Sequence, residues 1–353
     1  MELKWDMIVL TLTGLFVLWI VSMFMESLVR SVLLPKVIDK YVLITGCDTG
    51  FGSIVIRQLD RRGVHVFAAC LTAKGQKEVE SKTSDRVITL RLDVTDHESV
   101  VAASEFIKKK LPKDTGLWGL VNNAGIANLP GLIDWSTKDD YKRIIDVNLL
   151  GVIDVTLTFL PLLKKARGRV VNIASALSRV AMGSGGYAES KYGVQAFSDT
   201  LRRESRMMNY GIKVSILEPG FFKTQLTSPE KTRSEIKKSW DRLSKEKQAE
   251  FEPDMHEKLS NISVNFMNFV SSPNLTIVTN AMMHGLLARW PKTRYSCGLD
   301  MKVIFIPLSY APTWFTDFWI GRSTHNDKAP EEKEKEEKLQ SGAFGSMFVA
   351  TNN

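Results

Sequence analysis

Near the start of the chain a short apolar run stands directly before three glycines, and this order constrains the fold more than any other feature. Residues 40–45 (KYVLIT) have the continuous apolar character of a strand that is buried on both faces of a parallel sheet. Gly46, Gly50 and Gly52 follow, and residues 53–62 continue with a helical pattern. Glycines at such a junction permit a tight turn and a close approach of backbone. The segment therefore predicts a strand, a glycine turn and a helix.

The alternation of strand and helix patterns continues along the chain. Further apolar runs typical of strands lie at residues 64–71, 87–92, 117–122, 168–174 and 211–217. Helical patterns separate them, for example at residues 96–111 and 139–163. This order predicts the α/β class, with a single Rossmann-like doubly wound parallel sheet and helices on both faces. The 353 residues could hold two domains by length, but α/β folds of this size commonly form one, so we predict one catalytic domain over residues 38–320.

The first 34 residues have a different character. Residues 7–25 contain no charge over nineteen positions, close to the roughly 20 residues that cross a bilayer core as a helix. A cleaved signal peptide is the alternative, but the stretch is long for one, and residues 26–30 (ESLVR) offer no small-x-small cleavage site. We therefore predict a retained N-terminal transmembrane anchor over residues 1–34.

The charges beside this segment bear on its orientation. Lys4 precedes it among two acidic residues, whereas three basic residues follow between positions 30 and 40. The positive-inside rule then predicts that the catalytic domain faces the cytosol. Asn-x-Ser/Thr sequons at Asn261 and Asn274 would be glycosylation sites in a lumenal domain and keep that alternative open.

Overall charge and cysteine content exclude some classes of function. The net charge is +8 and the isoelectric point is about 9.2, but the basic residues are scattered among acidic ones. Nucleic acid is therefore not an expected partner, and attraction to anionic lipid surfaces is the milder interpretation. Cys47, Cys70 and Cys297 have no metal-ligand spacing, so we predict free thiols and no metal site.

Tyr187 and Lys191 are separated by four positions within a helical pattern. Side chains four apart lie on one face of a helix, so the hydroxyl and the ammonium can converge. A nearby cation favours phenolate and lowers the pKa of a tyrosine. Tyr187 could then serve as a general base. The same spacing is common on solvated helix faces, so its interpretation depends on the rest of the sequence.

Several motifs elsewhere in the chain supply that context. In order, the sequence carries the glycine turn, NNAG at residues 122–125, Asn148, Ser175 twelve positions before Tyr187, Lys191 and Pro219-Gly220. This ordered set resembles the short-chain dehydrogenase/reductase family over roughly residues 38–320. The resemblance implies a nicotinamide-dependent alcohol dehydrogenase or ketone reductase.

The resemblance also implies a cofactor-binding set. The family spacing Thr-Gly-x-x-x-Gly-x-Gly is matched from Thr45 to Gly52, with the helix N-terminus facing phosphate. The implied residues are Thr45, Gly46, Asp48, Thr49, Gly50, Phe51, Gly52, Asp93, Asn122, Ala124, Gly125, Tyr187, Lys191, Pro219, Gly220 and Thr224. Asp93 resembles the residue that hydrogen-bonds adenine, and Thr224 the one that contacts the carboxamide or phosphates. Either residue could instead cap a turn or a helix.

Preference between NAD and NADP depends on residues near the end of the second strand. Residues 69–74 (ACLTAK) hold no carboxylate for the ribose hydroxyls and one lysine. Asp48 and Thr49 stand where phosphate-binding relatives often place a basic residue. We therefore expect NAD, with NADP the less favoured cofactor.

The implied catalytic residues are Ser175, Tyr187, Lys191 and Asn148. In the family, the serine hydrogen-bonds the substrate oxygen, the tyrosine accepts the proton, the lysine holds the nicotinamide ribose, and the asparagine anchors a water relay. The lysine and the positive nicotinamide ring would together lower the tyrosine pKa toward neutrality. Ser175 could alternatively hydrogen-bond its own backbone.

Finer similarities point to a subgroup. Segments such as GCDTGFG, GLWGLVNNAG and PKTRYS resemble the microsomal retinol dehydrogenases and 3α/17β-hydroxysteroid dehydrogenases. This resemblance implies a lipophilic alcohol substrate, an endoplasmic reticulum membrane location and a possible homodimer. Phe221 and Phe222 are candidate substrate contacts beside Ser175 and Tyr187. Apolar residues at 303–308 and 314–320 would form a lid or a membrane-dipping element, or would pack in the core.

Other interpretations remain open. A small-hydroxyacid dehydrogenase of the 3-hydroxybutyrate type has similar motifs, and a catalytically idle scaffold that binds nucleotide or lipid is a further alternative. The complete set of catalytic residues argues against an idle scaffold. Residues 321–353 form a charged tail, which we expect to be disordered or weakly helical and to carry no chemistry.

Overall fold

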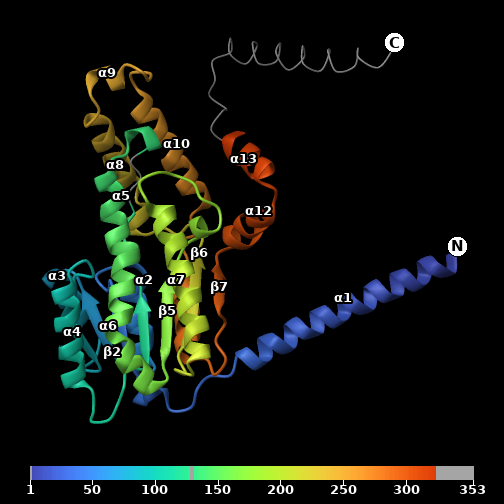
Figure 1. The fold of residues 1–353 in the computed structure, drawn as a ribbon, viewed down its shortest axis with the longest axis vertical. Helices are drawn as coiled ribbons and strands as arrows, with labels where there is room; N and C mark the ends of the chain where they lie inside the picture. Colours follow the sequence, from blue (N-terminus) through green and yellow to red (C-terminus); the bar gives the residue numbers. More distant parts are fainter. Residues whose placement is uncertain (1, 128–130, 323–353) are drawn as a thin grey trace. The chain divides into compact units, whose positions relative to one another are not determined.

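The strands of the described chain pair in parallel in one sheet, as the α/β prediction requires. The computed structural model describes residues 2–127 and 131–322. The strands are β1 (Tyr41–Thr45), β2 (His65–Cys70), β3 (Val87–Arg91), β4 (Gly119–Asn122), β5 (Arg169–Ile173), β6 (Lys213–Pro219) and β7 (Arg294–Cys297). Their order is β3-β2-β1-β4-β5-β6-β7 (Figure 1). The order reverses between β1 and β4, so the predicted doubly wound, Rossmann-like sheet is confirmed.

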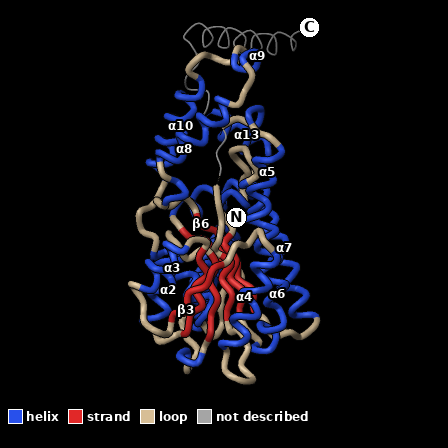
Figure 2. Tube along the Cα trace, turned by 90° about the vertical axis from the view of Figure 1, so that its left-hand side faces the viewer, coloured by secondary structure: helices blue, strands red, loops and turns tan. Residues whose placement is uncertain are grey.

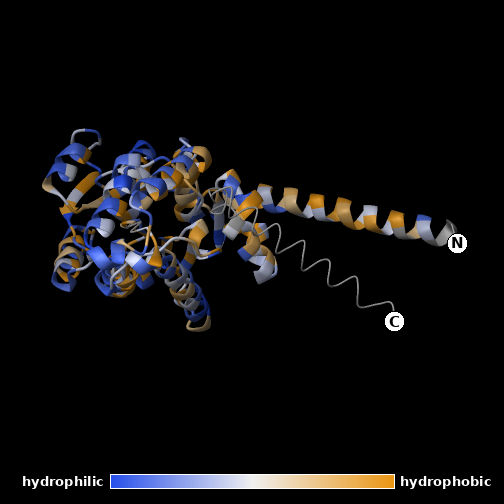
Figure 3. Ribbon diagram, turned by 90° about the horizontal axis from the view of Figure 1, so that it is seen from above, coloured by the Kyte–Doolittle hydropathy of each residue, from blue (hydrophilic) through white to orange (hydrophobic). Residues whose placement is uncertain are grey.

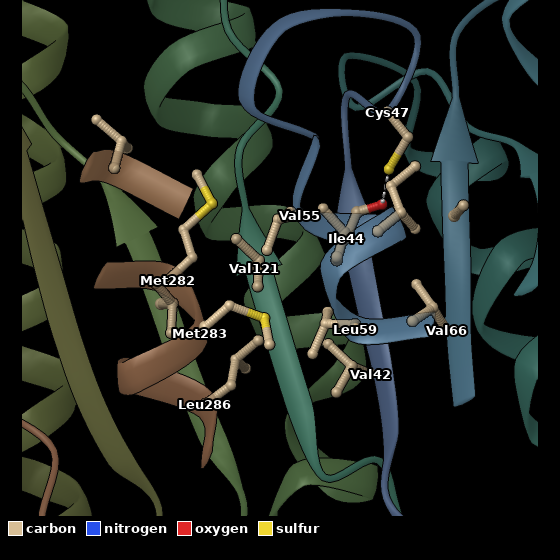
Figure 4. Close-up of a cluster of buried hydrophobic side chains, with 14 of the residues drawn as sticks. Val42, Ile44, Cys47, Val55, Leu59, Val66, Val121, Met282, Met283 and Leu286 are labelled. Carbon is tan, nitrogen blue, oxygen red and sulfur yellow. Dashed lines mark hydrogen bonds between the residues drawn. The ribbon is translucent and has the colours of Figure 1, made fainter. Parts of the chain in front are cut away.

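Both faces of the sheet are buried, and the apolar runs of the strands explain why. Successive side chains of a strand point to opposite faces. Val42 and Ile44 of β1 accordingly join one buried cluster, while Leu43 between them joins another. Helices α2 (Gly50–Arg61) and α11 (Thr276–Leu287) complete the first cluster (Figure 4). Helices α4 (His97–Lys110), α6 (Gly151–Ala166) and α7 (Tyr187–Met207) complete the second, on the other side of the sheet (Figure 2).

Further helices lie around the sheet and beyond the ends of its strands. They are η1 (Val37–Asp39), α3 (Ala73–Glu80), η2 (Ile133–Trp135), α5 (Lys138–Ile145), η3 (Asp146–Leu150), η4 (Ala176–Ser178), η5 (Gln225–Thr227), α8 (Pro229–Asp241), α9 (Lys245–Gln248), α10 (Met255–Val270) and η6 (Met301–Phe305). Figure 1 places α8 and α10 beyond the carboxyl ends of the strands, where ligands bind in open α/β sheets. Trp135, Ile236 and Trp240 form a separate small core there.

Two local features differ from the sequence prediction. Strand β7 was not predicted, because its four residues Arg-Tyr-Ser-Cys alternate polar and apolar side chains and form no apolar run. The helix predicted over residues 139–163 is divided into α5 and α6 by η3, a π-helical turn. Such turns mark functional sites in many helices. This one contains Asn148.

The N-terminal apolar segment forms the single helix α1 (Glu2–Arg30). The most apolar 18-residue window within residues 5–30 has a mean hydropathy of 2.4, and none of this window is buried. Hydrophobic residues recur along α1 in Figure 3. A second stretch, residues 138–166, is also long and apolar enough to span a membrane. It packs into the hydrophobic core through α6, where Val155, Phe159 and Leu163 are fully buried.

The end of α1 is hydrogen-bonded to the segment that leads into β7. His284 Nε2 lies 2.8 Å from the Arg30 carbonyl oxygen, and Arg30 Nη1 donates to the carbonyl oxygen of Pro291 at 3.1 Å. Beyond the helix, Leu34 N–H donates to the Leu287 carbonyl oxygen at 2.8 Å. The end of the apolar helix is thus held by several hydrogen bonds to the segment between α11 and β7.

The chain divides after Phe305, and a second unit begins at Ile306. Its described part contains α12 (Ile306–Tyr310) and α13 (Thr313–Arg322). Tyr310, Trp314 and Phe318 are exposed there, so these apolar residues provide surface and do not fill a core. The predicted charged tail lies outside the described residues from position 323 onward.

The buried carboxylate of Glu218 in β6 connects several elements of the fold. Glu218 of β6 is fully buried and accepts hydrogen bonds from Arg179 Nε at 2.8 Å and from Arg294 Nη1 at 3.0 Å. Gln195 Nε2 of α7 donates to the same carboxylate at 2.8 Å. Arg294 also pairs with Asp199 of α7 at 2.6 Å. This network ties β6, β7 and α7 to the loop that follows β5.

We expect Glu218→Ala to lower the free energy of unfolding by about 3–5 kcal/mol, because it leaves two guanidinium groups without their buried partner. Urea denaturation followed by circular dichroism measures the change. Asp241→Ala, which breaks an exposed ion pair with Lys237, is the matched control and should leave the midpoint unchanged. Equal midpoints for the Glu218 variant and the wild type would contradict this account.

Candidate active site

The site is organised by the turn after β1, where the chain meets the end of β4. The Thr45 hydroxyl accepts hydrogen bonds from Asn123 N–H at 3.1 Å and Ala124 N–H at 3.0 Å. Asn123 Nδ2 in turn donates to the carbonyl oxygens of Thr45 and Gly46, both at 2.9 Å. The residues after two neighbouring strands are thereby held together at the point where the strand order reverses.

The three glycines of this turn have different roles. Gly46 has a φ of +69°, and a Cβ there would lie 2.7 Å from the Ala124 Cα. A Cβ on Gly52 would lie 2.4 Å from the Gly46 carbonyl oxygen, so this glycine permits α2 to pack against the turn. Gly50 has a φ of +61° but open space beside it. Gly46 and Gly52 are therefore required by packing, whereas Gly50 leaves backbone accessible.

The first turn of α2 is open to a ligand. Thr49 is the N-cap residue of this helix, but its side chain makes no capping hydrogen bond. The neighbouring helices α3 and α4 do have side-chain caps, from Thr72 and Asp96. Unpaired N–H groups at a helix N-terminus attract anions. This end of α2 is thus suited to bind phosphate.

A groove runs along the turn. Of the predicted cofactor-binding residues, Gly46, Asp48, Thr49, Gly50, Phe51, Asp93, Ala124, Gly125 and Thr224 line it. Thr45, Gly52 and Asn122 lie behind this lining. Asn122 is buried and donates through Nδ2 to Asn172 Oδ1 at 2.8 Å and Thr156 Oγ1 at 2.9 Å, which ties β4 to β5 and α6.

The carboxylates of Asp48 and Asp93 are both engaged by nearby backbone. Asp48 accepts from Leu71 N–H at 2.8 Å and Thr72 N–H at 3.0 Å, so it joins the glycine turn to the end of β2. Asp93 accepts from Thr95 N–H at 2.9 Å. Asp93 thus makes the turn-capping contact that was the alternative to cofactor binding in the sequence analysis. It also lines the groove.

Ser175, Tyr187 and Lys191 meet in a second pocket that adjoins the groove. Ser175 follows β5 and caps η4, where its Oγ accepts from Leu177 N–H at 3.2 Å. Tyr187 begins α7 directly after Gly186, whose φ is +88°. The side chains of Ser175 and Tyr187 are hydrogen-bonded to each other. Ser175 therefore bonds to its own backbone and also faces the tyrosine.

The electrostatics of this pocket differ from the sequence prediction. Burial raises the pKa of Tyr187 above its ordinary value, and the hydrogen bond with Ser175 opposes this only in part. Lys191 Nζ donates to the Ile173 carbonyl oxygen at 2.9 Å and lies 5.7 Å from the centroid of the Tyr187 ring. The pKa of Tyr187 is thus not lowered by these contacts as predicted. Burial instead lowers the pKa of Lys191 to about 8.

Asn148 is fully buried, and its amide is bonded to backbone. Its Oδ1 accepts from Ile126 N–H at 2.8 Å, and its Nδ2 donates to the Ile126 carbonyl oxygen at 2.9 Å. Nδ2 also lies 3.2 Å from Ser190 Oγ on α7. A Cβ on Gly125 would lie 3.2 Å from Asn148 Oδ1 and 3.7 Å from Lys191 Nζ. The small Gly125 thus lets β4, η3 and α7 approach one another.

The segment after β6 forms the apolar wall of the pocket. Its lining residues are Gly220, Phe221, Phe222 and Leu226, together with Pro219 at the end of β6 and Met267 of α10. Phe222 packs edge-on against Phe51 of the glycine turn, with ring centroids 5.8 Å apart. Thr224 lines both the groove and the pocket, and its N–H donates to Thr227 Oγ1 at 3.1 Å. Both the predicted contact and the alternative capping role are compatible with that position.

Sequence reasoning missed two residues of the site. Asn123 lines both the groove and the pocket, and its place in the NNAG motif was the available signal. Asp300 accepts from Phe221 N–H at 2.7 Å, and a Cβ on Gly220 would lie 2.1 Å from its Oδ2. Asp300 lies about 80 positions from this turn, so no local pattern could have identified it.

Comparison with known proteins gives a consistent result. The family model described as short chain dehydrogenase matches residues 40–235. Retinol dehydrogenase 7 of Rattus norvegicus is 50% identical over 279 residues, which cover 79% of this chain and 87% of the relative. Retinol dehydrogenase 16 of Homo sapiens is 50% identical over 289 residues, covering 81% and 90%. The 17-beta-hydroxysteroid dehydrogenase type 6 of Homo sapiens is 49% identical over 286 residues, covering 81% and 89%.

A solved structure supports the fold. The crystal structure of a short chain dehydrogenase/reductase from Burkholderia phymatum in complex with NAD is 22% identical, with a TM-score of 0.55. The match covers 69% of this chain and 84% of that chain.

The depressed pKa of Lys191 predicts a pH dependence of stability. Its pKa is about 8 in the folded chain, against 10.5 for an ordinary lysine, so the folded state binds fewer protons between these values. The free energy of unfolding should therefore rise with pH from about 8 to 10.5, by roughly 3 kcal/mol at most. Urea denaturation of the wild type and of Lys191→Met across this range isolates the contribution. A difference between them that does not change with pH would exclude a depressed Lys191 pKa.

Proposed function

Because the chain belongs to the short-chain dehydrogenase family and is an oxidoreductase of that type, we propose that it oxidises a bulky apolar alcohol with a nicotinamide cofactor. The observation that carries the proposal is the meeting of Ser175, Tyr187 and Lys191 in one pocket beside the glycine-turn groove. In this proposal the enzyme is membrane-anchored and converts all-trans-retinol to retinal, a 3α- or 17β-hydroxysteroid to a ketosteroid, or both.

The groove suits a dinucleotide. The uncapped first turn of α2 and the open space beside Gly50 would receive the diphosphate, because both leave backbone N–H groups accessible. Asp93 lines the part of the groove that would receive adenine, and Asn123 the part shared with the catalytic pocket. When bound, the nicotinamide supplies hydride acceptance from the carbinol carbon.

NAD is the proposed cofactor. The carboxylate of Asp48, in the turn after β1, contacts the backbone that follows β2, where the adenosine ribose of a dinucleotide binds in doubly wound folds. A carboxylate at this place disfavours the additional phosphate of NADP through like-charge repulsion. Leu71 and Thr72, whose N–H groups bind the Asp48 carboxylate, add no positive charge that could hold this phosphate.

Protein groups control the proton at the substrate oxygen. As the phenolate, which the positive charge of an oxidised nicotinamide would favour against burial, Tyr187 Oη would accept this proton during oxidation and return it during reduction. Ser175 Oγ would hold the substrate oxygen beside it. Lys191 Nζ lies in the same buried pocket, where it donates to the Ile173 carbonyl oxygen and would hold the nicotinamide ribose. Asn148 positions the backbone of Ile126 at the pocket wall.

The substrate class rests on the pocket lining and on the relatives. Phe221, Phe222, Leu226 and Met267 offer apolar and aromatic surface with no cation to hold a carboxylate at that wall. The named relatives are retinol and hydroxysteroid dehydrogenases. A small hydroxyacid would leave this apolar surface unfilled, so a lipid alcohol suits the pocket better.

An endoplasmic reticulum membrane with the catalytic domain on the cytosolic side is the proposed location. The exposed apolar helix α1 supports an anchor, and the basic residues that follow it support the orientation. Lipid alcohols partition into membranes, so an anchored enzyme would meet its substrate there.

We expect Tyr187→Phe to reduce turnover by roughly 100- to 10,000-fold while NADH affinity stays close to that of the wild type, because only the proton-transferring hydroxyl is removed. NADH formation by membranes that carry the full chain, with NAD and all-trans-retinol or a 3α-hydroxysteroid, measures turnover. Parallel assays with NADP and with 3-hydroxybutyrate test the cofactor and the substrate class.

Wild-type rates in the Tyr187 variant would show that this residue is not the proton acceptor. Turnover of 3-hydroxybutyrate alone would favour a small-hydroxyacid dehydrogenase. NADH binding without turnover of any tested alcohol would favour a nucleotide-binding scaffold.

A further inference from the structure

Lys231, in the first turn of α8, is a charged residue of the groove to which the sequence motifs assign no role. It lines the groove together with Thr224, Gln225 and Leu226 of the segment after β6. Among the described residues that line this groove, it is the single cation, beside the two carboxylates of Asp48 and Asp93. Both carboxylates accept hydrogen bonds from backbone N–H groups, and neither forms an ion pair with Lys231.

The ammonium of Lys231 is partly buried, and no hydrogen bond or ion pair holds it within the described part of the chain. Burial lowers the pKa of Lys231; Glu235 one turn later opposes this shift, and Arg143 adds to it. Glu235 is itself engaged by Arg143 Nη2 at 3.6 Å and Lys238 Nζ at 3.5 Å. A partly desolvated charge without a bonded partner costs free energy, which an incoming anion would recover.

The position of Lys231 in the groove indicates which anion it would bind. Thr224 and Leu226, its neighbours in the lining, also line the catalytic pocket, whereas Asp48 and Thr72 mark the adenosine end of the groove. Lys231 therefore belongs to the catalytic side of the groove. The phosphates of a dinucleotide on that side are those of the diphosphate, between the two riboses.

Charge balance supports the same choice. A dinucleotide diphosphate carries two negative charges, and the N-terminus of α2 supplies the equivalent of only about half a positive charge. Lys191 already donates to the Ile173 carbonyl oxygen in the adjoining pocket. The groove thus needs a further cation, and Lys231 is the one that its lining contains.

We propose that Lys231 binds the diphosphate of the nicotinamide cofactor and so joins α8 to the bound cofactor. The inference rests on the proposed function, since it assumes that the groove takes a dinucleotide. It adds a residue from outside the glycine turn to the binding site. It also connects the cofactor to the segment after β6 that forms the apolar wall of the substrate pocket.

The test compares ligand affinities of the full chain in detergent, followed by the change in tryptophan fluorescence on NADH addition. ADP-ribose and adenosine, as competitors of NADH, report binding with and without a diphosphate. We expect Lys231→Ala to weaken NADH and ADP-ribose about tenfold and to leave adenosine unchanged, because one charge-assisted hydrogen bond is lost. Lys231→Arg should recover most of the affinity, since it keeps the charge.

Lys237→Ala is the matched control, because Lys237 lies on the same helix, pairs with Asp241 and does not line the groove. Its affinities should equal those of the wild type. Comparison of urea midpoints shows whether the Lys231 variants remain folded. A separate competition with 2′-phospho-ADP-ribose distinguishes the diphosphate from an adenosine-ribose phosphate.

Three results would overturn the inference: unchanged NADH affinity in Lys231→Ala, an equal loss for adenosine, or a loss confined to ligands with a 2′-phosphate. If the wild-type chain failed to bind NADH at all, the proposed function itself would be wrong. The two failures are therefore distinguishable in one experiment.

Discussion

The close packing of the turn after β1 against the end of β4 is the constraint on which the site depends. A Cβ at Gly46 would overlap the backbone of Ala124, and the Thr45 hydroxyl holds two N–H groups of the same segment. Because β1 and β4 are neighbours whose following helices cover opposite faces, the chain leaves the two strands in opposite directions and a groove forms between the two connections. The glycines keep the two backbones close, and the direction of the helices opens the space above them.

The candidate catalytic groups depend on the same packing. Gly125, three residues past β4, leaves room for both the amide of Asn148 and the ammonium of Lys191. The Asn148 amide in turn binds the backbone N–H and the carbonyl oxygen of Ile126. It can do so because the π-helical turn places Asn148 inward, where it is fully buried. A larger residue at position 125 would therefore disturb three segments together. The buried hydrogen bonds of Glu218 to two arginines hold the end of β6, from which the segment of the apolar wall continues.

Much of this arrangement could be predicted from local patterns. Six strands are continuous apolar runs, and the glycines, Ser175, Tyr187 and Lys191 stand at spacings that identify their neighbours in space. What could not be predicted depends on contacts distant in sequence. Strand β7 is too short and polar to be recognised, Asp300 reaches its turn from about 80 positions away, and the pKa of Tyr187 is set by burial that no spacing reveals. Lys231 belongs to this group, since its sequence context is that of an ordinary surface helix.

The groove and the catalytic pocket share Phe51, Asn123 and Thr224, and this shared wall has an energetic consequence. Phe51 stands in the glycine turn, yet its ring packs on Phe222 of the apolar wall. A ligand that orders the turn therefore also orders a surface that the second ligand contacts. Coupling of this kind is reciprocal, so each ligand must strengthen the binding of the other by the same factor. In the proposed function, the contact between Phe51 and Phe222 would therefore couple binding of the cofactor to binding of the substrate.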